Sequence, residues 1–400
     1  MPKMMRSFGV LTVSKVAIWR KGNSFLWDVI EAALIVCTGA YLALVLFFIL
    51  GWVRRPAPPA PPEALPKVSI VVPFRDEGPN LMANTPAART DIYPLNRTEL
   101  IYVDDHSEDD GPEHVVDLIH QYPDLPIDLI SLTKESGKKA ALSAGIRRSN
   151  GQIVATLDAD THTGHRWLHT LAHRFGDDTL MLVMPVQYAA PKRGWQSLLA
   201  LEFTSLVASG MASLNLGLPL MANGANLAFR RAAWLEVNGY QSHAHIPSGD
   251  DLFLMFALDN LAPGSVRGVL DPAAIAYTDP PASLREFVHQ RIRWAGKTPA
   301  YKHPWPIGVA VTVLGWNMVA LAALIGAFWW PQLWAVLAWC AAAKLVVDSA
   351  FLYLATGFFH QRKLLVWLPV LATVYPFYTV GIGLASLLVR PWWKGRKLDF

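Results

Sequence analysis

Acidic side chains follow three apolar segments of this chain, and their types and spacing suggest metal chemistry. Glu77 lies just after the first segment. Asp104 and Asp105 end the second, and Asp158 and Asp160 follow a later one. Carboxylates gathered in one place repel one another unless a cation joins them. An Asp-x-Asp turn supplies the hard oxygen ligands that Mg²⁺ or Mn²⁺ prefers, usually shared with a phosphate, although solvated surface turns also contain such pairs.

Basic residues in the same region indicate an anionic ligand. Arg75 lies two residues before Glu77, and Gly137-Lys138-Lys139 opens an expected helix. A lysine at a helix start opposes the helix dipole, so either a bound diphosphate or a solvated loop would explain it. The chain has neither a Gly-x-x-x-x-Gly-Lys loop nor a Gly-x-Gly-x-x-Gly loop. This disfavours a kinase, an ATPase or a dehydrogenase.

Two later motifs add candidates for catalysis. Asp250-Asp251 follows a Ser-Gly pair, and Gln-Arg-Ile-Arg-Trp occupies residues 290–294. A carboxylate can take a proton from a hydroxyl while a metal neutralises a departing diphosphate. Arg293 offers a two-pronged donor for phosphate oxygens, and Trp294 can stack on a sugar face. The alternative for the last motif is the ordinary end of an amphipathic helix.

Three further features leave two interpretations each. His243 and His245 supply either a metal ligand or part of a solvated loop. The apolar stretch 194–221 is either a core helix or a helix lying against a membrane beside a lipid. Lys344 and Asp348 lie four residues apart in an apolar segment, so they can pair on one helix face. Such a pair is either functional or a packing contact between helices.

The elements that must position these residues are short apolar strands that alternate with helices. We expect strands at 68–73, 99–103, 127–132, 153–157 and 180–184, and helices near 80–89, 112–121, 138–148 and 164–175. Such alternation predicts an α/β fold with a doubly wound, mostly parallel sheet and right-handed crossovers. Ligands bind such sheets at the carboxyl ends of the strands, which is where the acidic residues lie.

The chain also carries long apolar segments. Hydrophobic residues make up 52% of the 400 positions and charged residues 16%, against about 25% charged in soluble domains. Segments 32–53, 307–343 and 364–389 lack charged residues, and each is long enough for a bilayer core of about 30 Å. Residues 329–332, Trp-Trp-Pro-Gln, interrupt the second and predict a hairpin whose second helix runs to about residue 359. We expect one N-terminal and about three C-terminal membrane helices.

The charges around these segments bear on partners and orientation. The formal net charge is +4, and basic residues collect near the apolar segments, which indicates a membrane surface as partner and no nucleic acid. Basic residues between 285 and 302 precede the hairpin, and its tip has none, which predicts a cytoplasmic central domain. The basic residues at the two ends of the chain conflict with this orientation, because each end lies an odd number of membrane crossings from the central domain. A last segment that bends at Pro376 and re-enters, or an interfacial helix near 8–19, would relieve the conflict. Cys37 and Cys340 lie in apolar runs, which excludes a disulfide scaffold and a cysteine-ligated zinc site.

The predicted organisation has five parts. They are a basic segment at 1–31, an anchor helix at 32–53, a proline-rich extended linker at 54–66, a central domain at 67–302 and a membrane region with a basic tail at 303–400.

The motifs as an ordered set resemble the membrane-integrated family 2 glycosyltransferases of GT-A type, which include cellulose, chitin and hyaluronan synthases and ceramide glucosyltransferase. The resemblance covers about residues 67–300 and rests on Pro-x-Arg-x-Glu, Asp-Asp, Gly-Lys, Asp-Ala-Asp, Gly-Ala-Asn-Leu-Ala, the acidic pair and Gln-x-x-Arg-Trp. It implies an inverting transfer of a sugar from a UDP- or GDP-sugar, with Mg²⁺ or Mn²⁺ as cofactor.

The same resemblance implies roles for individual positions. Donor-binding positions are Pro73, Arg75, Glu77, Asp104, Asp105, Lys138, Lys139, Asp158 and Arg293. Asp158 and Asp160 match the metal-binding pair, Asp251 matches the catalytic base, and Gln290 and Trp294 border the acceptor. Many relatives have Glu-Asp where this chain has Asp250-Asp251, so the role of Asp250 stays open.

The expected function is a membrane-bound glycosyltransferase in a bacterial inner membrane. The favoured acceptor is a lipid hydroxyl, because the apolar segments carry few polar residues to line a wet sugar path. A processive polysaccharide synthase and an inactive nucleotide-binding membrane scaffold are the alternatives.

Overall fold

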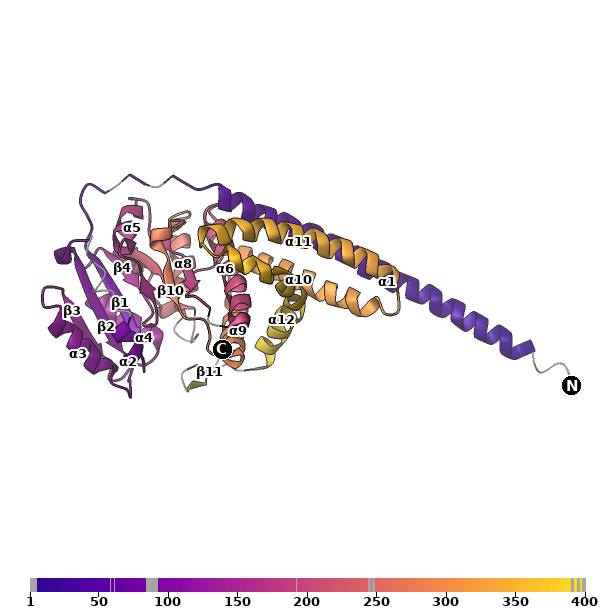
Figure 1. Cartoon of the computed structure of the whole chain (residues 1–400), viewed down its shortest axis with the longest axis horizontal. Helices are drawn as coiled ribbons and strands as arrows, with labels where there is room; N and C mark the ends of the chain where they lie inside the picture. The colour runs from indigo at the N-terminus through magenta and orange to yellow at the C-terminus, as the bar shows by residue number, and fades with distance from the viewer. Residues whose placement is uncertain are drawn as a thin grey trace.

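The computed structural model describes residues 6–57, 59–60, 62–83, 93–191, 193–243, 246, 249–389, 392–393 and 396–397. The molecule is elongated, with a sheet and its helices at one end and long helices running away from them toward the N-terminus (Figure 1). The extended linker after residue 53 joins the first long helix to the sheet.

A seven-stranded sheet forms the centre of the central domain. Its order is β3-β2-β1-β4-β8-β6-β9. The strands are β1 Val68–Phe74, β2 Thr98–Asp104, β3 Ile127–Ser131, β4 Ile153–Thr156, β6 Met181–Val183, β8 Leu227–Arg230 and β9 Val266–Gly268. β8 runs antiparallel to both β4 and β6, and the other pairings are parallel. The predicted α/β fold with a mostly parallel sheet is therefore confirmed, with one reversed strand that the alternation rule did not reveal.

Helices cover both faces of this sheet, and a small second sheet lies beside it. The helices are α2 Gly78–Ala83, α3 Gly111–Gln121, α4 Lys138–Arg148, α5 Trp167–Arg174, α6 Gly194–Leu214, α7 Arg231–Glu236, α8 Asp250–Leu261 and α9 Leu284–Ala295. The small sheet contains β5 His162–Thr163, β10 Ala276–Thr278 and β7 Val186–Tyr188. α4 has the predicted bounds, and residues 84–89 of the helix predicted at 80–89 lie outside the described residues.

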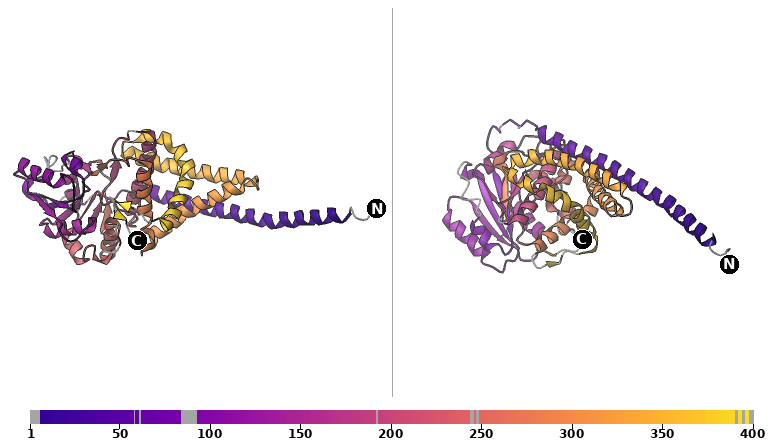
Figure 2. Two further views of the ribbon diagram at one scale, coloured as in Figure 1. Left: turned by 90° about the horizontal axis from the view of Figure 1, so that it is seen from below. Right: turned by 45° about the vertical axis from the view of Figure 1, so that its right-hand side comes forward.

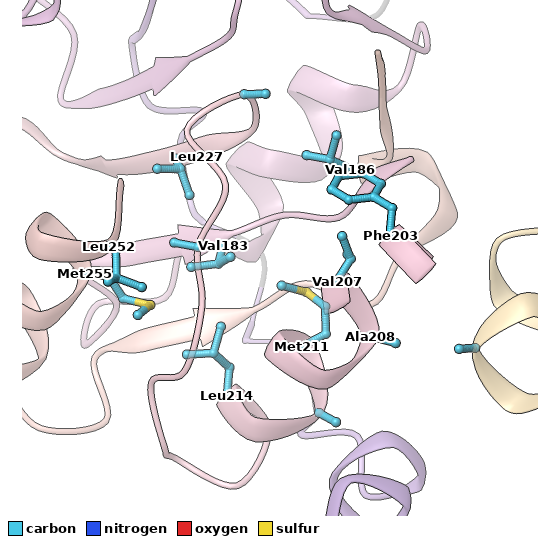
Figure 3. Close-up of a cluster of buried hydrophobic side chains, with 14 of the residues drawn as sticks. Val183, Val186, Phe203, Val207, Ala208, Met211, Leu214, Leu227, Leu252 and Met255 are labelled. Carbon is cyan, nitrogen blue, oxygen red and sulfur yellow. The ribbon is translucent and has the colours of Figure 1, made fainter. Parts of the chain in front are cut away.

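The two faces of the sheet belong to two different cores. Alternate residues of a strand face opposite sides, so Ile70 and Val72 pack into a core with α3 and α5, whereas Val71 packs into a second core. This second core continues through α6 and α8 into the long helices. Figure 3 shows its centre, where Met211 and its neighbours on α6 meet strand residues such as Val183. The sheet and the helical bundle therefore share one apolar interior.

The long helices are α1 Arg6–Val53, α10 Pro304–Gly326, α11 Gln332–Phe358 and α12 Leu368–Leu388. Within the described residues, five helical segments are long and apolar enough to cross a membrane: 25–53 of α1, α6, α10, α11 and 362–388. The sequence of α6 allowed either a core helix or a helix lying against a membrane. Its Phe203, Val207 and Met211 are buried in the shared core. α10 and α11 form a hairpin whose tip points away from the sheet (Figure 1).

Both ends of the chain form long helices, which bear on the two alternatives drawn from the charge pattern. α1 is continuous from Arg6, so the separate interfacial helix expected near 8–19 is instead part of the anchor helix, which extends beyond the hairpin tip (Figure 1 and both views in Figure 2). α12 contains Pro376 and packs against α10 and α9, and the short strands β11 Trp392–Trp393 and β12 Arg396–Lys397 after it pair with each other. The re-entry of this last segment stays a prediction.

Candidate active site

A cavity of about 1260 Å³ lies between the carboxyl edge of the sheet and the long helices. Its sheet end is lined by Pro73, Arg75, Glu77, Asp105, Lys138, Asp158, Asp160, Asp250, Asp251, Gln290, Arg293 and Trp294. Its other end is lined by apolar side chains of α1, α6, α10, α11 and α12. Twelve residues predicted from separate motifs therefore meet in one space.

Backbone contacts between strand ends fix the carboxylates. The Asp105 N–H donates to the Phe74 carbonyl at 2.9 Å, which ties the end of β2 to the end of β1. The Asp105 carboxylate accepts the Gly137 N–H at 2.9 Å, so it also holds the start of α4. Gly137 has a φ of 98°, a conformation that favours glycine. The Gly-Lys motif is thus a turn that brings Lys138 to the carboxylates.

The Lys138 ammonium bridges two of the acidic motifs. Its Nζ lies 2.5 Å from Asp158 Oδ1 and 3.9 Å from Asp250 Oδ2. Burial alone would lower the pKa of Lys138, but the charges of Asp158 and Asp250 raise it well above its ordinary value. A cation at a helix start is therefore stabilised here by neighbouring anions, and the alternative of a solvated loop is wrong.

The Asp160 carboxylate lies close to two other negative charges, those of Asp158 and Glu77. Its Oδ2 accepts a hydrogen bond from the Thr278 hydroxyl at 3.1 Å. Burial, together with the charges of Asp158 and Glu77, raises the pKa of Asp160 to about 6. A cation beside these three carboxylates would favour their ionised forms, so the residues fit a divalent metal. In the part of the chain that the structure describes, no three His, Cys, Asp or Glu side chains are already grouped around one ion position.

The acidic pair begins α8. Gly249, with a φ of 83°, precedes it and turns the chain into the helix. Asp251 Oδ2 accepts the Gly224 N–H at 3.1 Å, and Lys297 Nζ lies 3.9 Å from its Oδ1. Burial raises the pKa of Asp250, although the Lys138 charge opposes the shift. The two adjacent aspartates thus have different partners.

Little space is left for a side chain at position 224. A Cβ at this position would lie 3.1 Å from Asp250 Oδ2 and 3.2 Å from Lys138 Nζ. Gly224 lies in the loop before β8, and its backbone N–H reaches Asp251 without filling the cavity. The Gly-Ala-Asn-Leu-Ala motif is thereby tied to the carboxylates.

The Gln-Arg-Ile-Arg-Trp motif lies in the last turns of α9, whose start is capped by Ser283. Arg293 faces Asp250, Asp251 and Asp158, and burial lowers its pKa against the effect of these charges. Gln290 accepts a hydrogen bond from the Tyr188 hydroxyl at 3.4 Å. The motif is therefore more than an amphipathic helix end, because both residues line the cavity.

Arg291 of the same motif points toward the helical bundle. It pairs with Glu202 of α6, and both side chains are at most 4% exposed. Its guanidinium lies 4.3 Å from the Trp294 ring centroid and 4.9 Å from that of Phe287. The Arg291 contact fixes the Trp294 ring at the point where the polar end of the cavity meets its apolar end.

Two predicted donor-binding side chains lie outside the cavity lining. The Asp104 carboxylate accepts the Ser107 N–H at 2.8 Å and shapes the turn after β2. Lys139 Nζ donates to the carbonyls of His243 and Ile246 at 2.6 and 2.7 Å, so it holds that loop. Neither side chain lines the cavity, so direct contact of Asp104 and Lys139 with the donor stays a prediction that this geometry does not support. Both support backbone that carries Asp105 and Asp250.

The histidine pair has only one described member. The His243 ring stacks on Phe253 with centroids 4.2 Å apart. His245 lies outside the described residues. The stacking contact supports the loop interpretation for His243.

Several residues of the site were not singled out from the sequence. Lys297 lies three residues after Trp294, and this basic position next to a recognised motif was a usable signal. Thr278 and Gly224 contact the carboxylates from β10 and from the loop before β8. Glu202 lies in an apolar helix, where a lone acidic residue indicates a buried partner.

Comparison with family models places the chain among sugar-transferring proteins. The model described as glycosyl transferase family 2 matches residues 69–235, and that described as glycosyl transferase family group 2 matches residues 153–385. A mannosyltransferase from Pyrobaculum calidifontis, solved in complex with GDP-Man and Mn²⁺, superposes with a TM-score of 0.60 at 20% identity. That likeness covers 90% of this chain and 99% of the other and shows a shared fold.

Relatives by sequence carry related descriptions. An N-acetylglucosaminyltransferase of Mesorhizobium japonicum is 26% identical over 66% of this chain and 65% of its own length. The glycosyltransferase AglE of Haloferax volcanii is 31% identical over 26% of this chain and 34% of its own length. The chain thus spans less than two thirds of these relatives.

Proposed function

The chain belongs to the glycosyl transferase family group 2, and on that premise we propose that it transfers a sugar from a nucleotide-diphosphate sugar to a lipid hydroxyl at a membrane. The observation that carries the proposal is the single cavity. Its sheet end holds carboxylates and basic residues, and its other end is walled by helices apolar enough to lie in a bilayer.

The donor occupies the sheet end in this proposal. Arg75, Glu77 and Asp105 surround the nucleoside at the ends of β1 and β2, because all three line the cavity there. Arg293 and Lys138 contact the diphosphate, since they are the cations that face the carboxylates. The Pyrobaculum mannosyltransferase was solved with GDP-Man, which supports a nucleotide-diphosphate sugar as the donor class.

A divalent metal, Mn²⁺ or Mg²⁺, would be held by Asp158 and Asp160 and by the diphosphate. The raised pKa of Asp160 beside Asp158 and Glu77 supports a cation at this position. Such a metal supplies charge neutralisation of the departing diphosphate. Lys138 now holds Asp158, so it would move toward the diphosphate when the donor arrives.

Asp251 acts as the base. The acceptor hydroxyl oxygen attacks the anomeric carbon opposite the diphosphate, the bond from that carbon to the diphosphate oxygen breaks, and the configuration inverts. The hydroxyl proton passes to Asp251, whose carboxylate is held by the Gly224 N–H and faces the Lys297 ammonium. Asp250 lies between Lys138 and Arg293 and keeps them oriented.

The acceptor hydroxyl enters from the membrane side. Trp294 stands where the two ends of the cavity meet, and beyond it the walls are mostly apolar side chains such as Phe203, Leu314 and Phe351. An apolar tail in this space buries hydrophobic surface, whereas a sugar chain would lose hydrogen bonds there. A lipid acceptor therefore suits these walls better than a growing polysaccharide.

The catalytic domain lies in the cytoplasm in this proposal. The ends of α1, α10 and α11 that meet the domain carry the basic flanks, and the hairpin tip carries none. Re-entry of α12 would bring the basic residues that follow it to the same side in this proposal. A reporter fused after Lys302 is expected to report a cytoplasmic location, and a periplasmic signal would contradict both the orientation and the donor class.

The decisive experiment is a transfer assay with the purified full chain. Labelled UDP- and GDP-sugars are incubated with Mn²⁺ or Mg²⁺ and native membrane lipid, and the products are extracted with organic solvent. Label in short glycolipids is the expected result. Label in long water-soluble chains would show a polysaccharide synthase, and failure of every donor to transfer or hydrolyse would favour an inactive scaffold.

A further inference from the structure

A polar cluster lies inside the helical end of the cavity. Lys344 donates to Asp348 one turn further along α11, and the Tyr41 hydroxyl of α1 donates to the other Asp348 oxygen at 3.0 Å. The ammonium also lies 4.6 Å from the Tyr41 ring centroid and 5.2 Å from that of Trp316 on α10. The predicted pairing of Lys344 with Asp348 is present, and side chains of three helices converge on it.

The cluster is far from the ends of its helices. Lys344 lies 14 residues before the end of α11 at Phe358, which is about 21 Å at ~1.5 Å per residue. Tyr41 lies 12 residues before the end of α1 at Val53, about 18 Å by the same rise. Both of these helix ends lie next to the sheet domain (Figure 1). The cluster is therefore near the middle of a bilayer core of about 30 Å, where a charge is costly.

The ammonium has hydrogen-bonding capacity to spare on the cavity side. Lys344 is 7% exposed, and Lys344 and Asp348 both line the cavity that contains Asp251. An ammonium has three N–H donors, and among the described residues its hydrogen-bond acceptor is Asp348. Asn317 of α10 differs in position: it is fully buried, its amide donates to the Val313 carbonyl of its own helix, and it does not line the cavity.

We propose that the Lys344–Asp348 pair recognises a neutral oxygen group, best a hydroxyl, carried part-way along the tail of the lipid acceptor. The pair has no net charge, so an anion would be repelled by Asp348 and a cation by Lys344. A hydroxyl can accept from Lys344 and donate to Asp348, which uses both partners. The inference rests on the proposed lipid acceptor and narrows it to lipids with a second polar group.

The depth of the pair decides between two sources of such an oxygen. An ester carbonyl of a glycerolipid lies within a few bonds of the head hydroxyl. Lys344 lies about 21 Å along α11 from the end that meets the sheet domain, a span of many methylene groups, so an oxygen borne by the middle of a long chain matches this depth. We therefore assign the group to the middle of the tail.

The test compares octadecanol with a chain-matched diol whose second hydroxyl lies near mid-chain, using the full chain in lipid nanodiscs. We expect kcat/KM for sugar transfer to be at least tenfold higher for the diol, the effect of one hydrogen bond to a charged group. The double variant Lys344→Met with Asp348→Leu removes both charges at similar volume and should use both alcohols at similar rates. The control Ser349→Ala changes a hydroxyl that bonds within α11 and should keep the preference.

Binding without donor separates this inference from the proposed function. The diol should raise the unfolding temperature of the wild-type protein more than octadecanol does, and the double variant should lose the difference. If the diol binds preferentially but no lipid receives sugar, the proposed acceptor is wrong and the site stands. Equal binding and equal transfer of the two alcohols by the wild-type protein would overturn the site.

Two further arms complete the test. A matched pair of ester and ether glycerolipids checks the other oxygen source, and a preference for the ester that depends on Lys344 would overturn the mid-chain assignment. If the double variant fails to fold, Tyr41→Phe removes one hydrogen bond to Asp348 and should reduce the diol preference severalfold. An unchanged preference in a folded double variant, or in Tyr41→Phe where the double variant does not fold, would contradict the proposal.

Discussion

The two ends of the cavity handle charge in opposite ways. At the sheet end, Lys138 and Lys297 face Asp158, Asp250 and Asp251 across 2.5 to 3.9 Å, in a space open to ligand. At the helical end, Arg291 and Glu202 form a buried pair whose side chains are at most 4% exposed. Charges at the sheet end can change partners when a ligand arrives. The Arg291–Glu202 pair is enclosed by Tyr378 and Trp294, so it contributes to the fold, whereas the Lys344–Asp348 pair faces the cavity.

This comparison predicts the largest loss of activity for removal of the metal. Chelation should abolish transfer. Asp160→Asn should do the same without unfolding the protein, because the Asp160 carboxylate is repelled by the charges of Asp158 and Glu77 and does not stabilise the fold through an ion pair. Circular dichroism and a transfer assay with added Mn²⁺ measure the two effects. Asp177→Asn at an exposed position is the matched control. Full transfer in excess chelator would remove the metal from the mechanism.

Substitutions at the helical end of the cavity should lower the free energy of unfolding, whereas those at the sheet end lower activity. Glu202→Ala leaves the Arg291 guanidinium buried and unpaired, which costs about 3–5 kcal/mol of unfolding free energy. The double variant Glu202→Leu with Arg291→Met should recover most of this loss, because neither charge remains. Unfolding of detergent-solubilised protein by denaturant gives both values. Equal losses of unfolding free energy in the single and double variants would mean that the unpaired charge of Arg291 is not the cause of the loss.

Asp251→Asn tests the catalytic base. Turnover should fall on the order of 10²-fold or more, which is about 2.7 kcal/mol of activation free energy. Donor binding should survive, because Asn can still accept the Gly224 N–H. Isothermal titration with nucleoside diphosphate and a turnover assay separate the two. Normal turnover in Asp251→Asn with loss in Asp250→Asn would transfer the role to the neighbouring aspartate.

The junction between the two ends can be tested at Gly51. A Cβ there would lie 2.0 Å from the Ala212 carbonyl oxygen of α6, so Gly51→Ala must separate α1 from α6. We expect a loss of about 1–3 kcal/mol of unfolding free energy. Gly39→Ala on the same helix is the control, since a Cβ at position 39 meets nothing within 4 Å. Equal stability of the two variants would contradict the close crossing.

The smallest effect belongs to an ion pair outside the cavity. Burial alone would raise the pKa of Asp271, but hydrogen bonds from Arg174 and from the Ala273 N–H lower it. A lowered carboxylate pKa stabilises the fold above the unfolded-state pKa of about 3.9, and this stabilisation is lost as the pH falls through the folded-state pKa. Asp271→Asn keeps the capping oxygen and should cost about 1 kcal/mol at pH 7. The two proteins should converge in stability once the pH has fallen below the lowered folded-state pKa of Asp271, and a gap that persists in acid would show that charge is not the cause.

The sequence predicted those parts of the site that rest on local signals. Strand ends, the Lys138 turn and the motif at 290–294 follow from short patterns, so their residues were found. The reversed direction of β8 depends on the return path of the chain through α6, which local periodicity does not report. The partner of Glu202 lies 89 residues away, so only tertiary structure identifies it. Asp104 and Lys139 belong to the same motifs as Asp105 and Lys138, which line the cavity. Adjacent side chains point in different directions, however, and the motif alone does not show which of the two faces the cavity.

α1 does more than join the N-terminus to the sheet domain, because it forms one wall of the cavity. Tyr41, Val45 and Phe48 line the space, and Trp52 packs edge-on against Phe351 and Phe358. Deleting the helix to obtain a water-soluble enzyme would open the cavity and expose the shared core. The protein therefore does not divide into a catalytic module and a removable membrane module, and truncated preparations should be judged by acceptor use rather than by solubility.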